Sequence, residues 1–193
     1  MANNVGKQFE RNFKDSCDKQ GILWERYPDS NKFNFGKGTR FTTQNPCDGH
    51  IFYKGHLYYI ELKSSKTGSL SFRLPPSKEQ TSIKPHQIKS LLERDKYDDV
   101  HGAFIIWFCD RDTKTKKIHG GTYYIPVQKF YQWAIHTNKK SINIDDAMMI
   151  GTPIDMKKKK VNYEFNVKWL LHELQNKGEN IYGNIDSIQS ING

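Results

Sequence analysis

Asp48, Glu61 and Lys63, which all lie between Asn45 and Lys63, are the residues whose types and spacing best suit chemistry in this chain. Two carboxylates that face each other repel, so either one is protonated or a cation lies between them. Hard oxygen ligands on rigid strands suit Mg²⁺ or Mn²⁺, which leave coordination positions for water and a phosphate oxygen. A lysine beside that water and phosphate would complete the groups that a phosphodiester hydrolase needs.

The facing of the two carboxylates depends on a β-hairpin that the sequence predicts. Two segments rich in β-branched and aromatic residues, Gly49 to Tyr53 and Leu57 to Lys63, flank Lys54-Gly55. If Lys54-Gly55 is a two-residue loop, Asp48 lies directly opposite Glu61 across the hairpin. A three-residue loop with a bulge would shift the pairing by one residue and turn Asp48 away, unless the bulge restored its direction.

The two faces of the second strand are expected to differ. Because side chains alternate along a strand, Glu61 and Lys63 share one face while Ile60 and Leu62 point into a core. The alternative interpretation is that Asp48-Gly49 forms a turn and that Glu61 and Lys63 form an exposed, charge-balanced edge. The apolar residues around the motif and the basic composition favour a site over that alternative.

Pro46-x-Asp48 followed by Glu61-x-Lys63 resembles the PD-(D/E)xK nuclease signature. Within that superfamily the chain most resembles the RecU-type Holliday-junction resolvases, including phage-borne members. Their hairpin likewise has Asp-x-Gly, a Tyr-Lys-Gly turn, an aromatic residue and then Glu-x-Lys at the same spacing. The resemblance covers about Gly6 to about Leu174. It implies an α/β (α+β) fold with a PD-(D/E)xK restriction-endonuclease-like core, in which helices flank a mixed β-sheet.

The resemblance also implies roles for residues outside the hairpin. PD-(D/E)xK nucleases often place an acidic residue of the first helix near the metal, which makes Glu10 a candidate. His86-Gln87 matches a His-Gln pair in RecU-type sequences, where His86 would contact DNA and Gln87 would orient a phosphate or water. Plain solvation is the alternative for Glu10, and a capping or surface role is the alternative for His86-Gln87.

The segment Asp29 to Gln44 is long for an ordinary loop, and such loops are usually functional or disordered. Cations that could contact phosphates alternate there with phenylalanines that could stack on unstacked bases. The DNA-binding candidates in it are Lys32, Phe33, Phe35, Lys37 and Arg40. RecU-type enzymes have a projecting stalk at this position, which enters the junction. The alternative is a loop whose phenylalanines pack back on the core.

Hydrophobic spacing and the positions of glycine and proline predict the remaining elements. They are a helix from Asn4 to about Gln20, a strand at Ile22 to Tyr27, a polar connection at Ser64 to Ile83, a helix from Pro85 to about Tyr97, strands at Gly102 to Cys109 and Thr122 to Val127, and helices at Gln128 to His136 and about Glu164 to Gln175. The run Gly102 to Cys109 is expected at the centre of the sheet. Lys66 and Arg73 in the connection are further DNA-binding candidates.

We expect one nuclease domain over residues 1–176, with a stalk-like insertion at about 28–45, and a poorly ordered tail over 177–193.

Composition limits the classes of protein that need to be considered. The net charge of +9 over 193 residues suggests an anionic partner, of which nucleic acid is the commonest. Cys17, Cys47 and Cys109 are too few and too widely spaced for a disulfide framework or a zinc site. The amino terminus is polar and the longest apolar run, Ala103 to Cys109, is too short to span a bilayer. We therefore expect a soluble, cytoplasmic protein with no membrane partner.

The sequence leaves three hypotheses for function. The first is a structure-selective, Mg²⁺-dependent endonuclease, with Mn²⁺ able to substitute, that resolves four-way (Holliday) junctions by paired symmetric cuts. The resemblance implies that it would act as a homodimer in phage recombination or replication, with recombination proteins of host or phage as further partners. The second is a duplex- or flap-cleaving nuclease of the same superfamily. The third is a junction-binding architectural protein whose carboxylates are vestigial.

Overall fold

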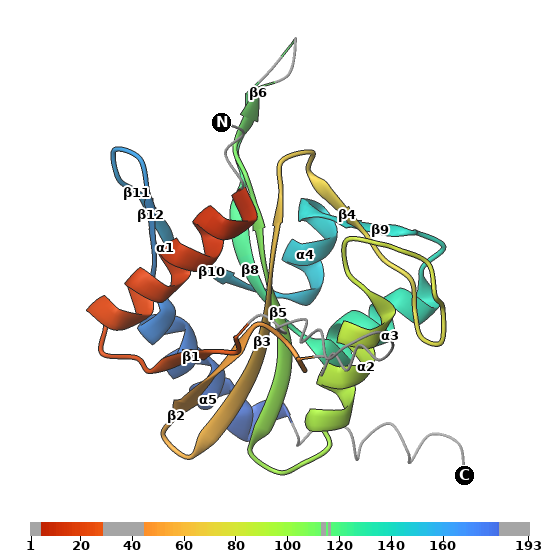
Figure 1. Cartoon of the computed structure of the whole chain (residues 1–193), viewed down its shortest axis with the longest axis horizontal. Coiled ribbons are helices and arrows are strands. Elements are labelled where there is room, and N and C mark those ends of the chain that lie inside the picture. The colour runs from red at the N-terminus through yellow and green to blue at the C-terminus, as the bar shows by residue number, and fades with distance from the viewer. Residues whose placement is uncertain (1–4, 29–44, 113–114, 116, 182–193) are drawn as a thin grey trace, which may run out of the picture.

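The structure of the chain is a computed structural model that describes residues 5–28, 45–112, 115 and 117–181, with the backbone alone from 177 onward. Its centre is a six-stranded mixed sheet with the strand order β1-β2-β3-β5-β8-β10 (Figure 1). The strands are β1 (Trp24–Arg26), β2 (Gly49–Tyr53), β3 (His56–Ser65), β5 (Val100–Phe108), β8 (Gly121–Pro126) and β10 (Thr152–Ile154). β3 and β5 are parallel and every other neighbouring pair is antiparallel. The expected mixed sheet is confirmed, and so is the central position of the apolar strand β5.

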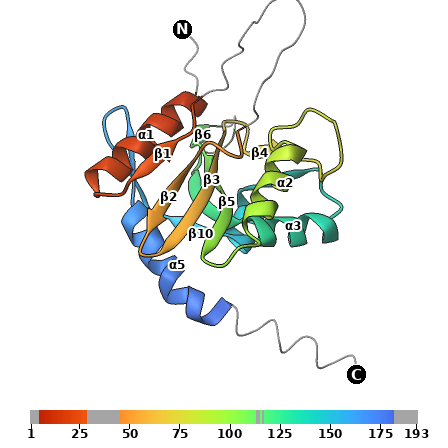
Figure 2. The same ribbon diagram turned by 60° about the horizontal axis from the view of Figure 1, so that its bottom comes forward.

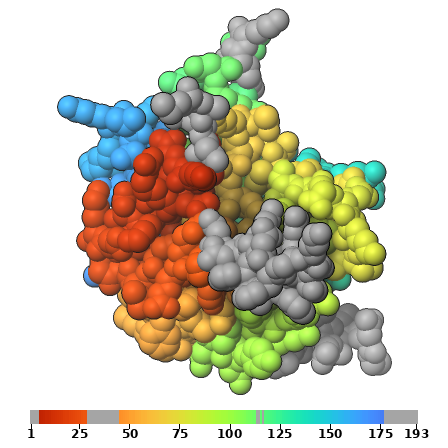
Figure 3. Space-filling model, in the orientation of Figure 1, coloured from red at the N-terminus to blue at the C-terminus, as the bar shows by residue number. Residues whose placement is uncertain are grey.

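Helices cover both faces of this sheet, as the α+β prediction requires. On one face lie α1 (Val5–Lys19) and α5 (Val167–Ile181), and on the other lie α2 (Pro85–Arg94), α3 (Val127–His136) and α4 (Ile144–Ile150) (Figures 1 and 2). Each face therefore has its own apolar core. In the space-filling view of Figure 3, α1 (red) and the yellow-green segment that includes α2 lie on opposite sides of the molecule. No helix in the described part of the chain is both long enough and apolar enough to cross a membrane.

The first core forms because α1 is apolar at four-residue steps. Phe9, Phe13 and Cys17 are buried against Ile60 and other side chains of the sheet. The helix ends at Lys19, and Gly21 follows with a positive φ of 67°. Glycine adopts this left-handed conformation without the steric penalty of other residues, so it can end the helix and turn the chain into β1.

The segment Ser64 to Ile83 differs from the polar connection expected from its composition. β3 continues through Ser65, and β4 (Ser69–Ser71) pairs with β9 (Ser141–Asn143). Leu70, Phe72 and Ile83 of this segment are buried in the second core. The partner strand lies about seventy residues later in the sequence, and neither strand has a strong alternating pattern of its own.

Two further strand pairs extend from the main sheet. β6 (Arg111–Asp112) pairs with β7 (Lys117–Ile118), and β11 (Met156–Lys158) pairs with β12 (Tyr163–Phe165). Helix α2 ends at Arg94, three residues before the predicted end. There the Asp95 side chain accepts a hydrogen bond of 2.7 Å from the backbone N–H of Gly102, which ties the end of the helix to β5.

Candidate active site

The β2–β3 hairpin has the two-residue loop that the sequence predicts. Tyr53 pairs with His56 and Gly49 pairs with Ile60. Lys54 and Gly55 both have a positive φ, of 47° and 90°, which is the requirement of the type I′ turn. This turn fits the right-handed twist of the flanking strands, so no bulge shifts the register.

With this register, Asp48 and Glu61 are the next facing positions beyond the Gly49 and Ile60 pair. The Asp48 Oδ2 atom accepts a hydrogen bond of 2.7 Å from the backbone N–H of Leu62, so this carboxylate supplies an acceptor to β3 just before β2 begins. The Asp48 carbonyl accepts a hydrogen bond of 2.8 Å from the N–H of Tyr27. Asp48 is therefore held between the first strand and the third.

Glu61 is a buried carboxylate, with 3% of its surface exposed. Burial raises its pKa to about 7, the nearby Lys63 ammonium opposes that rise, and the Asp48 carboxylate adds to it. Its neighbours on the strand, Ile60 and Leu62, belong to the core on the opposite face, as the alternation predicted. Ionising Glu61 near neutral pH therefore needs positive charge close by.

Lys63 and Gln87 both contact the same oxygen of Glu61. The Lys63 Nζ atom lies 2.9 Å from Glu61 Oε1, and the Gln87 Nε2 atom donates a hydrogen bond to that oxygen. The Gln87 Oε1 atom accepts a hydrogen bond of 3.0 Å from the backbone N–H of Lys84, just before α2 begins. The amide of Gln87 thus caps its own helix and holds Glu61. Within the described part of the chain, Lys63 and Gln87 are the side chains that contact the Glu61 carboxylate at hydrogen-bond distance.

Lys84 adds positive charge to this group from just before the start of α2, and His86 lies near it. The pKa of His86 is lowered by burial and by the ammonium groups of Lys84 and Lys63. Lys84 also stabilises the charged form of Glu61. The sequence interpretation named His86 but missed Lys84, although a lysine directly before Pro85 at a helix start could have suggested it.

The donor set fits a hard divalent cation of the Mg²⁺ type. The Asp48 carboxylate lies close enough to Glu61 to raise the pKa of Glu61. Among the residues that the structure describes, no group of three or more histidine, cysteine, aspartate or glutamate side chains could hold a metal. Mg²⁺ is commonly bound by one or two carboxylates and keeps its other positions for water and substrate phosphate, whereas structural zinc needs a complete protein cage.

Several other candidates lie in different surroundings, and their roles remain predictions. The Glu10 Oε2 atom lies 3.2 Å from Arg26 Nε, on the α1 side of the sheet. The Arg73 Nε atom lies 2.8 Å from Glu79 Oε2, and Lys66 lies near the thiol of Cys109, whose pKa it lowers against the larger effect of burial. The stalk candidates Lys32, Phe33, Phe35, Lys37 and Arg40 lie outside the described residues.

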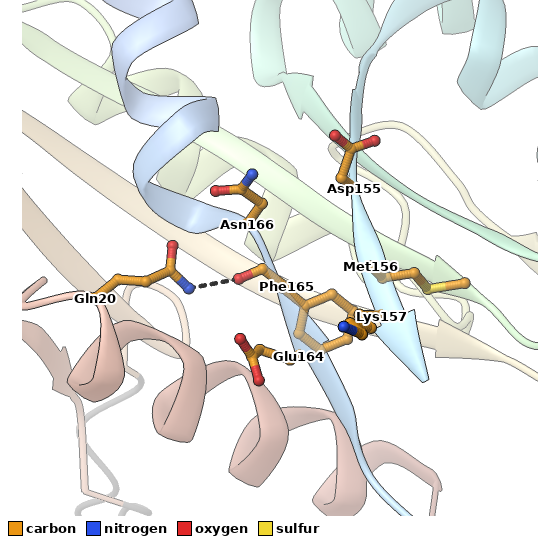
Figure 4. Close-up of a pocket in the computed structure, with 7 residues that line it drawn as sticks. All are labelled: Gln20, Asp155, Met156, Lys157, Glu164, Phe165 and Asn166. Carbon is orange, nitrogen blue, oxygen red and sulfur yellow. Dashed lines mark hydrogen bonds between the residues drawn. The ribbon is translucent and has the colours of Figure 1, made fainter. Parts of the chain in front are cut away.

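A cavity of about 370 Å³ lies on the other side of the sheet, beside the end of α1 and the start of α5 (Figure 4). The polar groups around this cavity make hydrogen bonds and ion pairs within the protein. The Gln20 Nε2 atom donates to the carbonyls of Phe165 and Ser16, at 2.7 Å and 2.8 Å. Glu164 pairs with Lys159 at 3.2 Å and with Lys19 at 3.6 Å. This cavity is separate from the carboxylate site, and none of the residues of that site lines it.

The chain is similar to a solved structure and to a prophage-derived protein. No family model matches the chain. Among solved structures, the fold is similar to the 1.6 Å resolution structure of Archaeoglobus fulgidus Hjc, a Holliday junction resolvase from an archaeal hyperthermophile. The identity is 16%, the TM-score is 0.47, and the likeness covers 77% of this chain and 95% of that one.

A curated relative is much nearer in sequence. It is the SPbeta prophage-derived uncharacterized protein YotM of Bacillus subtilis (strain 168), which is 34% identical over 178 residues. The match covers 90% of this chain and 88% of the relative. Identity of this size over nearly the full length of both chains means that they share one fold and one ancestry. The chain belongs to the family of the prophage protein YotM.

Proposed function

We propose that this protein is a divalent-metal-dependent endonuclease that resolves four-way DNA junctions by paired symmetric cuts. The observation that carries the proposal is that Asp48, just before β2, lies opposite Glu61 of the paired strand β3, with Lys63 Nζ 2.9 Å from Glu61 Oε1. Two carboxylates and an ammonium on one sheet face are the groups that phosphodiester hydrolysis with Mg²⁺ needs. The net charge of +9 supports a polyanionic substrate.

Each residue of the site has a distinct task in this mechanism. Asp48 and Glu61 would hold the cation, which supplies an activated water and neutralises charge on the phosphate. Lys63 stabilises the negative charge that grows on the phosphate and orients the attacking water. Gln87 is a positioning residue, because its amide holds Glu61 Oε1 and ties that carboxylate to the start of α2.

The junction, the homodimer and the phage setting extend the proposal beyond the site itself. The motif resemblance to RecU-type resolvases supports a branched DNA substrate, and the prophage origin of the YotM relative supports a phage setting. A symmetric junction needs two incisions, which a two-fold dimer would supply from two equivalent sites. Glu10 would assist the metal site and the 29–44 segment would enter the junction.

The test uses a labelled four-way junction and the matching linear duplex, each with Mg²⁺ and with EDTA. We expect paired cuts in the junction alone, lost with EDTA, and a loss of roughly 100-fold or more in rate for Asp48→Asn. The matched control is Asp98→Asn, which removes the same charge from an exposed turn and should cut at the wild-type rate.

The other outcomes separate the alternatives. Equal cutting of junction and duplex would identify a duplex nuclease that uses the same carboxylates. Tight junction binding without cutting under Mg²⁺ or Mn²⁺ would refute the nuclease and point to an architectural protein.

A further inference from the structure

A second cavity lies on the same face of the sheet as Glu61. Its volume is about 390 Å³, within the usual range for small-ligand pockets. It lies between β3, the end of α2 and the start of β5, three elements that lie side by side in Figure 2. Its lining consists of Leu57, Tyr59, Glu93, Arg94, Tyr97 and Val100. Aromatic and aliphatic walls with one cation and one carboxylate suit a flat ligand that carries polar edges.

The cavity is close to the proposed cleavage site. Tyr59 precedes Glu61 by two residues on β3 and shares its face, which places the two residues about 7 Å apart along the strand. A stacked DNA strand advances by about 3.4 Å per nucleotide. A nucleotide within roughly two steps of the phosphate at Asp48 and Glu61 can therefore reach this cavity.

Arg94 is held in place at the wall of the cavity. Its guanidinium carbon lies 4.9 Å from the centroid of the Tyr59 ring, and Nη1 donates to the carbonyl and hydroxyl oxygens of Ser90 at 3.3 Å and 3.1 Å. Within the described part of the chain, Arg94 makes no ion pair with a carboxylate. Its flat, charged group is thus ordered before any ligand arrives, which lowers the entropic cost of binding.

Tyr97 and Glu93 define the chemistry at the mouth. Tyr97 is 69% exposed, so its ring is accessible to a ligand at the mouth of the cavity. Exposed aromatic rings and guanidinium planes are platforms on which unstacked bases lie. The Glu93 carboxylate would repel a phosphate but can accept a hydrogen bond from the amino group of a base.

We infer that this cavity receives an unstacked nucleobase of the strand whose phosphate lies at Asp48 and Glu61. The inference rests on the proposed function, because that function places the DNA strand on this face. It adds a specific position for a base beside the cut, held by Arg94 and Tyr97. A branch point is where such a base is available, since its stacking partner has been lost.

The test places the fluorescent base 2-aminopurine at successive positions on either side of the crossover of a synthetic junction. Wild-type protein is titrated in EDTA, so that binding is measured without cutting. We expect strong quenching at a position next to the cut site, and an affinity between about fivefold and 100-fold weaker in Tyr97→Ala and in Arg94→Gln. Tyr97→Phe, which keeps the ring, should retain the quenching. Lys129→Gln, which removes one exposed charge from the neighbouring helix α3, should retain it too.

The results separate this inference from the proposed function. Junction cutting with Mg²⁺, together with wild-type quenching in both Tyr97→Ala and Arg94→Gln, would overturn the inference alone. Equal loss of quenching in Lys129→Gln would also overturn it, because charge rather than the cavity would then carry the binding. A change of oligomeric state in Tyr97→Ala with unchanged quenching would show that the cavity is a contact between copies of the chain and would overturn the inference.

A single-stranded oligonucleotide with the same probe is titrated alongside. Quenching that is lost in Tyr97→Ala would support the base site even if wild-type protein failed to cut any DNA.

Discussion

Replacement of Glu61 by glutamine should make the protein more stable above neutral pH while abolishing any cleavage. In the folded protein, burial raises the pKa of this carboxylate from 4.5 to about 7. Each pKa unit corresponds to about 1.4 kcal/mol of free energy. Ionised Glu61 therefore lowers the free energy of unfolding by up to about 3 kcal/mol.

The direction of the pH dependence follows from the raised pKa. Below pH 4.5 the carboxylate is protonated in both the folded and the unfolded chain, so it imposes no penalty. As the pH rises through the window from 4.5 to about 7, the unfolded chain releases its proton first and stability is lost. Glutamine does not titrate, and its Oε1 atom can still accept the hydrogen bond from Gln87. The stability difference between Glu61→Gln and wild type should therefore grow across this window.

The assay is urea denaturation of both proteins in EDTA at several pH values. We expect Glu61→Gln to match wild type near pH 4.5 and to exceed it by about 1–3 kcal/mol near pH 8. Glu93→Gln, an exposed glutamate of α2, is the control and should change stability by less than about 0.5 kcal/mol. If Glu61→Gln were no more stable than wild type near pH 8, the conclusion that the buried, ionised carboxylate lowers the free energy of unfolding would be wrong.

Three further predictions concern other parts of the molecule. Gln87→Ala removes the cap at the start of α2 and a donor to Glu61, so we expect a loss of about 1–2 kcal/mol in urea denaturation, and an unchanged midpoint would contradict this. Gly49→Ala should destabilise by at least about 2 kcal/mol, because its Cβ would clash with the carbonyl oxygen of Glu25; a thermal melt at the wild-type temperature would show that β1 can move aside. Burial and then the neighbouring His56 lower the pKa of His101 below 6.5, so stability should fall as the pH drops below that value, and His101→Phe should remove this part of the acid dependence in pH-dependent melts.

The hairpin and much of the order of elements were predictable from the amino-acid sequence. Lys54-Gly55 between two β-rich segments predicted the hairpin but left open a two-residue loop or a three-residue loop with a bulge. The positive φ of both residues and the observed pairing show the two-residue turn, which sets Asp48 opposite Glu61. The start of α2 at Pro85 and the central strand β5 were also predictable. These features depend on interactions between residues close in sequence, or on a continuous apolar run, so local chemistry suffices to specify them.

The depth at which Glu61 is buried and the groups that surround it depend on packing between segments far apart in the sequence. Gln87 lies twenty-six residues away in sequence, yet its amide donates to the Glu61 carboxylate because α2 packs against β3 and β5. The pairing of β4 with β9 and the cavity beside Tyr59 and Arg94 likewise join distant segments. Such contacts depend on how both faces of the sheet are covered. The residue types of a short motif therefore indicate its chemistry, while the packing of remote helices sets the dielectric surroundings and the pKa of its carboxylates.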